Sequence, residues 1–354
     1  MNDRMIRFGL VLLVVLNTSA GADPGDPAKP PPAPRPKHIN AETEAAIEKG
    51  LEFLVSTQGR EGAWRNRTGY GTYPVAMSAL GGLALLMNGS TPTQGKYAAN
   101  VDRVTDFLLS CATDTGLIAL RAEDGNRPMY GHGFSMLFLG EVYGMTEDVD
   151  RQQRIHNTLK RAVALTAQAQ SDLGGWIYQP DGGTDEGSVT ITQLQGLRAC
   201  RNGGISVPKS VIDKALDYLK ISFRSDGGIA YRARNPGPSR PPITAAAICC
   251  WFNAGDYDNP MAKKALRYCR STIGPGEKNI GHYFYAHLYY AQALYLAGDA
   301  EAWDEYFPKI RDILLSKQNE DGSWMGDGVG KPYGTALALI ILQLPYNRIP
   351  IMQR

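Results

Sequence analysis

Apolar and polar positions follow one another along this chain at helical spacing, in two kinds of segment. The first kind is amphipathic: in 41–57, Leu51 and Leu54 fall on one side and Glu44 on the other. The second kind, such as 73–87, is apolar nearly all round, as expected of a helix that is buried on every side. No segment keeps a period of two over the length of a strand, so we predict an all-α protein with almost no sheet.

An amphipathic segment is followed by an apolar one six times, at an average interval of about fifty residues. The expected pairs are 41–57 with 73–87, 97–111 with 132–143, 151–171 with 188–202, 207–223 with 243–254, 259–271 with 283–297, and 301–317 with 333–344. Six helical hairpins can close into a ring, and a closed ring has no terminal repeat that needs a polar cap. We therefore predict an α6/α6 toroid, in which six outer helices surround six inner ones.

A short motif marks the turn inside several of these hairpins: a Gln, then a Gly, then a Trp. Its copies read Gln58-Gly-Arg-Glu-Gly-Ala-Trp64, Gln168-Ala-Gln-Ser-Asp-Leu-Gly-Gly-Trp176 and Gln318-Asn-Glu-Asp-Gly-Ser-Trp324. A degraded copy, 225–231, has Tyr231 in the expected Trp place. After the second copy, Ser188 is the expected N-cap of the next helix, because its hydroxyl can accept a free backbone N–H.

This motif, and above all Gly175-Trp176 followed by Ser188-Val-Thr-Ile-Thr-Gln193, is similar to the repeat of the squalene-cyclase/protein-prenyltransferase family. The resemblance covers about 41–344 and implies an α/α toroid with a central cavity for an isoprenoid. It does not carry over the family's chemistry. The Asp-x-Asp-Asp acid of triterpene cyclases is matched only in part, by Asp148-Val-Asp150.

Protein prenyltransferases bind zinc through Asp, Cys and His, and the first two positions fall on Ala246 and Ile248 in this chain. One remaining histidine, His282 or His287, does not hold zinc. We therefore expect no metal and no other cofactor.

The first residues resemble a secretory signal peptide. Arg4 and Arg7 precede a nine-residue apolar run, 8–16, and Ala20-Gly-Ala22 is a typical cleavage pattern. Nine apolar residues are too few to span a bilayer, so we expect no membrane span after cleavage. The predicted organisation is a signal peptide at 1–22, a Pro-rich linker at 23–40 and a toroid domain at 41–354, exported to the periplasm or beyond the cell.

Charge adds little. The whole chain has 37 basic and 35 acidic residues, a formal net charge of +2. Such a balance gives no basis for binding nucleic acid or an anionic membrane surface.

In a ring of this kind the inner helices run in parallel, so their N-termini gather at one mouth, with unpaired N–H groups and positive dipole ends. Basic loop residues expected there are Arg65, Arg67, Arg127, Arg232, Arg234, Arg240 and Lys331, and tyrosines are Tyr70, Tyr73, Tyr130, Tyr178, Tyr231, Tyr283 and Tyr333. They suit an anionic or polyhydroxylated ligand. Alternatively, the loop charges pair with Glu123, Asp181, Asp185 and Glu186.

The ligand-binding candidates are Tyr73, Tyr178, Arg240, His282, Tyr283, His287 and Tyr333. Three of them belong to 282–290, the most aromatic helix, which either grips a ligand or fills the core.

Four residues are candidate acids or bases. Asp185 and Glu186 precede an inner helix, where they either exchange protons with a substrate or stabilise the first turn. His132 is expected to begin an inner helix and to be neutral there. Glu141 follows on the same apolar helix, where a carboxylate needs a partner, Arg198 or a tyrosine, or a cavity.

The leading hypothesis is an isoprenoid-related toroid that binds or converts a lipid-like ligand. A carbohydrate-active enzyme, such as a polysaccharide lyase using Tyr or His with Arg, and a non-catalytic scaffold are the alternatives. Aliphatic and Phe-rich cavity walls would favour lipid, and a polar groove with paired carboxylates or with Arg and Tyr would favour sugar. A cavity plugged by side chains would favour a scaffold.

Overall fold

The computed structural model describes residues 35–68, 71–277 and 279–353. Within these residues the chain forms twelve α-helices and three short 3-10 helices, and the only β-type pairing is five isolated bridges. The predicted signal peptide, most of the predicted linker and Tyr70 lie outside the described residues. None of the helices in the described part combines the length and the apolar character that a membrane span requires.

The α-helices are α1 (Ala41–Thr57), α2 (Pro74–Met87), α3 (Ala98–Ser110), α4 (Pro128–Val142), α5 (Val149–Gln168), α6 (Gly187–Asn202), α7 (Lys209–Ser222), α8 (Pro241–Asn253), α9 (Pro260–Thr272), α10 (Tyr283–Ala297), α11 (Ala300–Ser316) and α12 (Lys331–Gln343). The 3-10 helices are η1 (Tyr143–Met145), η2 (Leu344–Tyr346) and η3 (Pro350–Met352).

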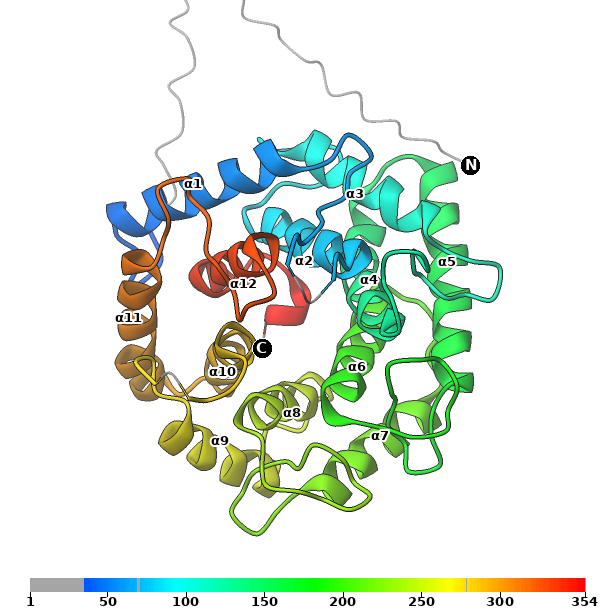
Figure 1. Ribbon diagram of the computed structural model, residues 1–354, viewed down its shortest axis with the longest axis vertical. Coiled ribbons are helices and arrows are strands. Elements are labelled where there is room, and N and C mark those ends of the chain that lie inside the picture. The colour runs from blue at the N-terminus through cyan, green and yellow to red at the C-terminus, as the bar shows by residue number, and fades with distance from the viewer. Residues whose placement is uncertain (1–34, 69–70, 278, 354) are drawn as a thin grey trace, which may run out of the picture. The chain divides into compact units, whose positions relative to one another are not determined.

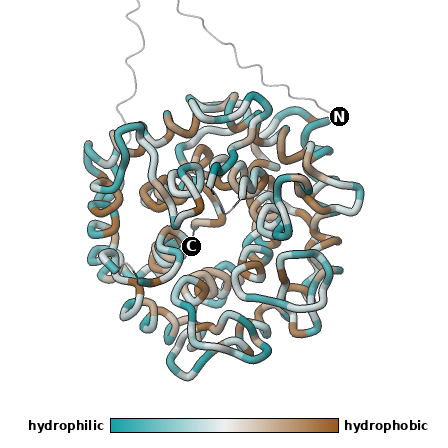
Figure 2. The backbone as a smooth tube through the Cα atoms, viewed as in Figure 1, coloured by the Kyte–Doolittle hydropathy of each residue, from teal (hydrophilic) through white to brown (hydrophobic). Residues whose placement is uncertain are grey.

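The even-numbered helices form an inner ring and the odd-numbered helices surround it (Figure 1). Each inner helix packs on the next, and α12 packs on α2 and α1, which closes the ring. This is the predicted α6/α6 arrangement. Most inner helices are predominantly hydrophobic, although α6 is mixed, whereas the outer helices alternate in character (Figure 2). All of α2 is buried, while α1 buries one side only.

The Trp of each motif ties the turn to the outer helix that precedes it. The indole N–H of Trp64 donates to the Leu54 carbonyl (2.8 Å), that of Trp176 to Thr166 (2.7 Å) and that of Trp324 to Leu314 (2.7 Å). The backbone N–H of each Trp donates, at 3.0 Å, to a hydroxyl on the following inner helix, from Ser78, Thr190 or Thr335. Because all three Trp side chains are buried, these bonds satisfy polar atoms that water cannot reach.

The Gln of each motif connects one hairpin to the next. Gln170, two residues after the expected Gln168, donates to the carbonyls of Gly174 and of Val211 in α7, both at 2.9 Å. Gln58 donates to Asn100 in the same way. Gln318 donates to Ala46 in α1 at 2.9 Å, so the last hairpin is bonded to the first.

The Gly before each Trp permits close contact between neighbouring hairpins. Gly174 has φ +95°, and a Cβ placed on it would lie 2.1 Å from the Lys214 carbonyl oxygen. Gly322, with φ +85°, meets the carbonyl oxygen of Lys49 in α1 in the same way, at 2.3 Å. Only Gly combines this left-handed backbone with the absence of a side chain.

The same geometry identifies two turns that the sequence prediction misread. Gly227 (φ +97°) packs against Lys264 of the next outer helix, as Gly174 packs against Lys214. The Ile229 N–H donates to Thr244 Oγ1, which is the bond that the Trp N–H makes in the other turns. Ile229, not Tyr231, is therefore in the Trp place. A further copy at Gly116 was missed, because an apolar Ile occupies its Trp place too.

Two boundaries differ from the prediction by more than three residues, whereas the other helix ends lie within three residues of it. Helix α4 begins at Pro128 rather than His132, since Pro is well suited to the first helical turn. The compact unit begins at Pro36, inside the predicted linker. Its first residues are held because Ile39 is buried, and because His38 Nε2 lies 2.7 Å from Asp304 Oδ1.

The C-terminal segment crosses the end of the ring where the inner helices finish. The Ile351 N–H donates to Glu141 Oε1 at 3.2 Å, and the Ile351 carbonyl accepts from Gln292 at 3.2 Å. Ile349, Ile351 and Met352 are buried. The opposite end, where the inner helices begin, carries the candidate site.

Candidate functional site

Partly exposed side chains in the first turns of the inner helices define the site. They come from α4, α6, α8, α10 and α12, because every residue of α2 is buried, and they are Tyr130, Ser188, Pro241, Tyr283, Tyr285, Lys331, Pro332 and Tyr333. The valine, isoleucine, methionine and phenylalanine side chains of these same turns are buried: Val75, Met77, Met129, Val189, Ile243 and Phe284. We use the name tyrosine mouth for Tyr130, Tyr178, Tyr231, Tyr285 and Tyr333.

Tyr130 joins α4 to the start of α6. Its hydroxyl lies 2.7 Å from Ser188 Oγ and 3.4 Å from Glu186 Oε1. Glu186 is the observed N-cap of α6, in place of the expected Ser188: its carboxylate accepts the N–H groups of Ser188 (2.8 Å) and Val189 (2.6 Å). Burial raises the pKa of Glu186, which these hydrogen bonds oppose. Both carboxylate oxygens are thus fully engaged by their own helix.

Tyr178 and Tyr231 follow the Trp places of consecutive hairpins by two residues. Their hydroxyls are hydrogen-bonded to each other. The Arg127 guanidinium lies over the Tyr178 ring, 4.9 Å from its centroid, and the Tyr130 ring lies 5.9 Å from Tyr178 on another side. Together they form an Arg–Tyr wall on one side of the mouth.

Tyr285 faces this wall from α10. Burial, with Tyr289, Tyr130 and Glu186 nearby, raises the pKa of its phenol far above the ordinary value. Its hydroxyl oxygen is buried and makes no hydrogen bond of ordinary geometry among the described residues, although the Tyr289 side chain lies close to it. A buried hydroxyl without a partner costs stability, unless a ligand or water completes it.

Asp327 is the carboxylate of the mouth that stays partly exposed. It caps α10 from another hairpin, accepting the Phe284 N–H at 3.1 Å, and it accepts the Tyr333 hydroxyl at 3.2 Å. Its φ of +50° is unusual for a residue other than Gly. Burial raises the pKa of Asp327, and the nearby His282 partly offsets this by lowering it. Asp327 is therefore a carboxylate held by strained backbone beside an exposed histidine.

Comparison with solved structures shows which proteins share the fold of this chain. An inactive variant of the α-1,6-mannanase GH76A of Salegentibacter sp. HEL1_6, in complex with α-1,6-mannotriose, is similar over 85% of this chain and 98% of its own, with 10% identity and a TM-score of 0.62. An α-amylase from Clostridium perfringens is similar over 89% and 99%, with 14% identity and a TM-score of 0.59.

The type II terpene cyclase MstE from Scytonema is similar over 87% of this chain and 98% of its own, with 14% identity and a TM-score of 0.59. The chain is an α/α toroid. No protein-family model and no curated protein sequence matches it, and identities of this size establish the fold alone.

The toroid separates the two expected acids of its third hairpin. Asp185 is buried and accepts the Ser171 hydroxyl at 3.1 Å, and it lies near Tyr218 of the outer helix α7. It points away from the mouth, whereas Glu186 reaches Tyr130. Neither carboxylate is exposed to a ligand.

Two histidine candidates lie between the inner and outer rings. His132 is fully buried, with Nε2 2.9 Å from Thr166 Oγ1 in α5, and burial lowers its pKa to about 4. It is neutral, as expected, but it is inside α4. His287 Nδ1 lies 2.8 Å from the Tyr306 hydroxyl of α11, and Tyr283 packs on His287 at 4.3 Å. His287, Tyr306 and Tyr283 thus pack together between α10 and α11.

Glu141 lies at the far end of α4 and bonds to Ile351, not to Arg198 or a tyrosine. Burial raises its pKa to about 7. Its second oxygen has no hydrogen-bond partner among the described residues. Glu141 therefore holds the C-terminal segment, at the end of the toroid away from the mouth.

The remaining candidates lie at helix starts. Tyr73 is the N-cap of α2, Arg240 of α8 and His282 of α10; Arg240 and His282 are exposed. Among the expected basic residues, Arg65 pairs with Glu123 (2.6 Å), as the alternative reading predicted, and Lys331 pairs with Asp321 (2.6 Å). In the described residues no group of three His, Cys, Asp or Glu side chains could hold a metal ion, and the expectation of no cofactor stays a prediction.

Sequence reasoning missed Asp327, and it included Tyr285 only as part of the aromatic stretch 282–290. A signal for Asp327 was present: it stands in Gly326-Asp-Gly328 directly before an inner helix. Aspartate between glycines tolerates left-handed backbone, so the stretch is typical of a loop that presents a carboxylate.

Proposed function

We propose that the toroid is an exported protein that binds a polyhydroxylated, carbohydrate-like ligand at the tyrosine mouth. The observation that carries this proposal is the composition of the accessible wall: mostly phenol rings and hydroxyls, with Lys331 and two prolines, while the Val, Ile, Met and Phe side chains of these turns are buried behind them. Tyrosine rings stack on the faces of sugar rings, and their hydroxyls hydrogen-bond to sugar hydroxyls. A hydrocarbon ligand would instead need accessible apolar wall.

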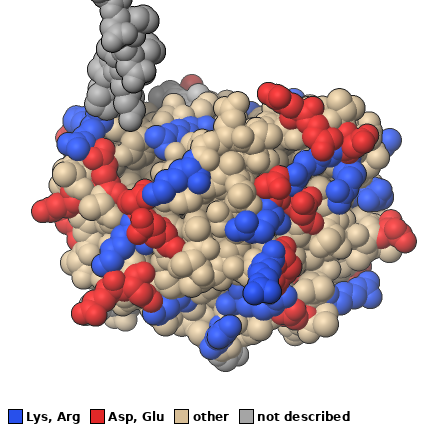
Figure 3. Space-filling model, turned by 90° about the horizontal axis from the view of Figure 1, so that it is seen from above, with Lys and Arg blue, Asp and Glu red and all other residues tan. Residues whose placement is uncertain are grey.

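Each part of the mouth has a role in this proposal. Tyr178, backed by Arg127, offers a ring for stacking. The poorly satisfied Tyr285 hydroxyl and the exposed edge of Asp327 bond to sugar hydroxyls. The balanced surface charge gives no reason to expect nucleic acid or a membrane as a partner; acidic and basic groups are interspersed on the face in Figure 3.

Binding is better supported than hydrolysis. Hydrolysis of a glycosidic bond uses two carboxyl groups on either side of it. Asp327 is available, but Glu186 is fully buried and bonds to the first turn of α6 and to Ser188. Asp327, although it also caps α10, is partly exposed, and one such carboxylate is enough to bind a sugar and too few for that mechanism.

An isoprenoid ligand is the second candidate. A cyclisation that begins with protonation needs one acid, and Asp327, whose pKa burial raises, is one acid among aromatic rings. Under this reading, aromatic faces stabilise the carbocation that forms.

The test is a thermal-shift screen of the purified protein with neutral oligosaccharides, oligouronates, prenyl diphosphates and triterpenes. A ligand at a hundred times its Kd stabilises the folded state by about 2.7 kcal/mol. We expect a shift with neutral oligosaccharides, lost in Tyr178→Ala and kept in Tyr295→Ala, a partly exposed tyrosine near the other end of α10. A shift with isoprenoids alone would favour the second candidate, and no shift with any class would leave an interaction scaffold.

A further inference from the structure

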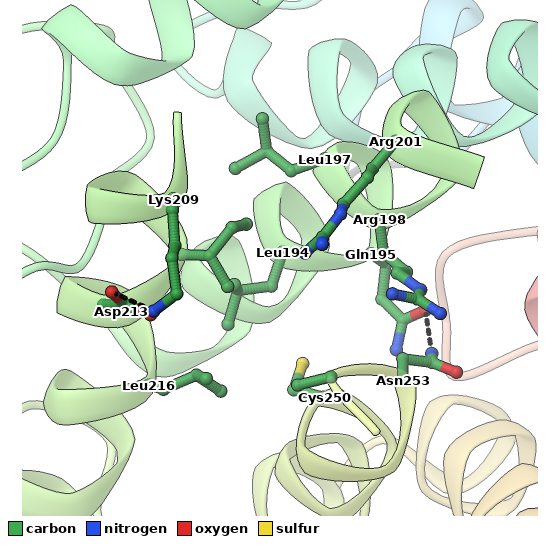
Figure 4. A pocket seen from close by; sticks show the side chains of 12 residues that line it. Leu194, Gln195, Leu197, Arg198, Arg201, Lys209, Asp213, Leu216, Cys250 and Asn253 are labelled. Carbon is green, nitrogen blue, oxygen red and sulfur yellow. Dashed lines mark hydrogen bonds and ion pairs between the residues drawn. The ribbon is translucent and has the colours of Figure 1, made fainter. Parts of the chain in front are cut away.

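A pocket lies at the end of the toroid opposite to the tyrosine mouth. It has a volume of about 170 Å³ and lies between α6, α7 and α8, near the C-terminal ends of α6 and α8 (Figure 4). An apolar cavity of about 150 Å³ is enough to admit benzene, so this pocket has room for a ring or for a chain of about six carbons.

Most of the pocket wall is apolar. Leu194 and Leu197 of α6, Ile212 and Leu216 of α7, and Cys250 of α8 line it. The two α7 side chains are partly exposed, so solvent reaches the pocket from the α7 side. The wall therefore favours a ligand with a hydrocarbon part.

One polar edge of the pocket is positively charged without compensation. Arg198 is half-buried, and none of the ion pairs or hydrogen bonds among the described residues involves its guanidinium or that of Arg201. Burial and the neighbouring Arg201 charge lower the pKa of Arg198. Asp213, the carboxylate in the pocket wall, pairs with Lys209 at 2.6 Å on the side of the pocket opposite to Arg198 (Figure 4). A half-buried arginine without a counter-charge is costly, and an anionic ligand removes that cost.

A buried amide beside Arg198 has only a weak acceptor for its N–H groups. Gln195 is 2% exposed; its Oε1 accepts from Asn253 Nδ2 at 3.0 Å, while its Nε2 lies near the Cys250 thiol and makes no hydrogen bond of ordinary geometry among the described residues. A thiol sulfur is a weak acceptor, so this donor is poorly satisfied at a depth where unpaired donors are rare in native proteins. Arg201 in the last turn of α6 also interacts favourably with the helix dipole, but that interaction does not account for the poorly satisfied Gln195 amide.

We propose that this pocket binds a small amphipathic carboxylate, such as a short fatty acid or an aryl acid. The carboxylate accepts hydrogen bonds from Arg198 and Gln195 Nε2, and the hydrocarbon part lies against Leu194 and Leu216. The arginine fork matches a carboxylate in bidentate fashion. Inorganic phosphate fits less well, because most of the wall offers it no donors.

The test is calorimetric titration of the purified protein with hexanoate and benzoate, alongside hexanol and inorganic phosphate. We expect the two carboxylates to bind with Kd near or below about 1 mM, and hexanol and phosphate to bind at least tenfold more weakly. Arg198→Gln should weaken hexanoate binding at least tenfold. Arg154→Gln, which removes the same charge from an exposed site on α5, should change nothing.

A second variant blocks the apolar part of the pocket. Ile212→Trp, at a partly exposed position, should abolish hexanoate binding while circular dichroism and Tm stay unchanged. No binding at about 10 mM hexanoate, equal binding of hexanol, or equal binding of phosphate would each overturn the proposal. Tyr178→Ala should leave hexanoate binding intact, which separates this test from that of the tyrosine mouth.

Discussion

His132 Nδ1 accepts the backbone N–H of Ile118 at 3.2 Å. The same bond is made by a Ser or Thr hydroxyl in other hairpins, as Thr190 does for Trp176. In the α3–α4 hairpin, then, a histidine replaces the hydroxyl, and Ile replaces the Trp. His132 is a buried acceptor that holds the turn, and its ring must be neutral to accept this bond.

The buried state of His132 predicts a pH dependence of stability. The unfolded chain takes up a proton near pH 6.5 and the folded chain only near pH 4, so between these values the unfolded state binds more protons. The contribution of His132 is complete above pH 6.5 and is lost as the pH falls to about 4, by up to about 3 kcal/mol.

His132→Gln should remove this dependence, so urea titrations of wild type and variant should converge as the pH falls from 7 to 4.5. Glu141, whose raised pKa acts in the opposite direction, is present in both proteins and cancels in the difference. A constant difference across this range would contradict a buried neutral His132.

Tyr285→Phe should raise Tm and weaken binding at the tyrosine mouth. The substitution removes a buried hydroxyl that makes no hydrogen bond of ordinary geometry among the described residues, which is worth up to about 1 kcal/mol in the ligand-free protein. Tyr306→Phe is the matched control, because its hydroxyl bonds to His287 at 2.8 Å. It should lower the free energy of unfolding by about 1 kcal/mol. Equal losses in both variants, measured by urea denaturation, would argue against a poorly satisfied Tyr285 hydroxyl.

Gly174→Ala should destabilise the toroid by at least about 3 kcal/mol, since the new Cβ would meet the Lys214 carbonyl and φ is +95°. Gly204→Ala is the control: its φ is +86°, but nothing lies within 4 Å of the new Cβ. That substitution should cost about 1 kcal/mol. Similar losses in the two variants would mean that backbone conformation, and not the close contact, explains the glycine.

Gln318→Ala should lower the free energy of unfolding by about 1–2 kcal/mol, because it removes two hydrogen bonds, from Gln318 Nε2 to the carbonyls of Ala46 and Gly322. Gln153→Ala, on the exposed face of α5, should change it by less than about 0.5 kcal/mol. Chemical denaturation of both variants measures the difference. A loss no larger than that of Gln153→Ala would mean that the seam between α11 and α1 does not depend on these bonds.

The helices and the ring could be predicted because each depends on local pattern. Apolar residues all round 73–87 predict a buried helix whatever lies next to it, and the repeated motif predicts the number of hairpins. The motif did not identify the turns at Ile118 and Ile229. There an aliphatic side chain occupies the position that Trp has in the other hairpins, and an isoleucine is too common in such sequences to mark a turn.

The candidate site was harder to predict, because side-chain direction depends on contacts distant in sequence. Asp185 and Glu186 are adjacent, yet one points to α7 and the other to Tyr130. Glu141 found its partner 210 residues away in the C-terminal segment. Tyr73, Tyr130, Tyr283 and Tyr333 do lie at the starts of inner helices, since that position depends only on helix direction, whereas their role in binding stays a prediction.

The hydrogen bond from Gln318 to Ala46, and the contact of Gly322 with Lys49, join the last hairpin to the first, so the array of repeats has no free end. In an open array of repeats, an end unit has one neighbour and can fray at little cost. Here every hairpin has two neighbours, so opening any one of them breaks two interfaces. The six hairpins should therefore melt together in one cooperative transition, although each carries its own helix-turn-helix contacts.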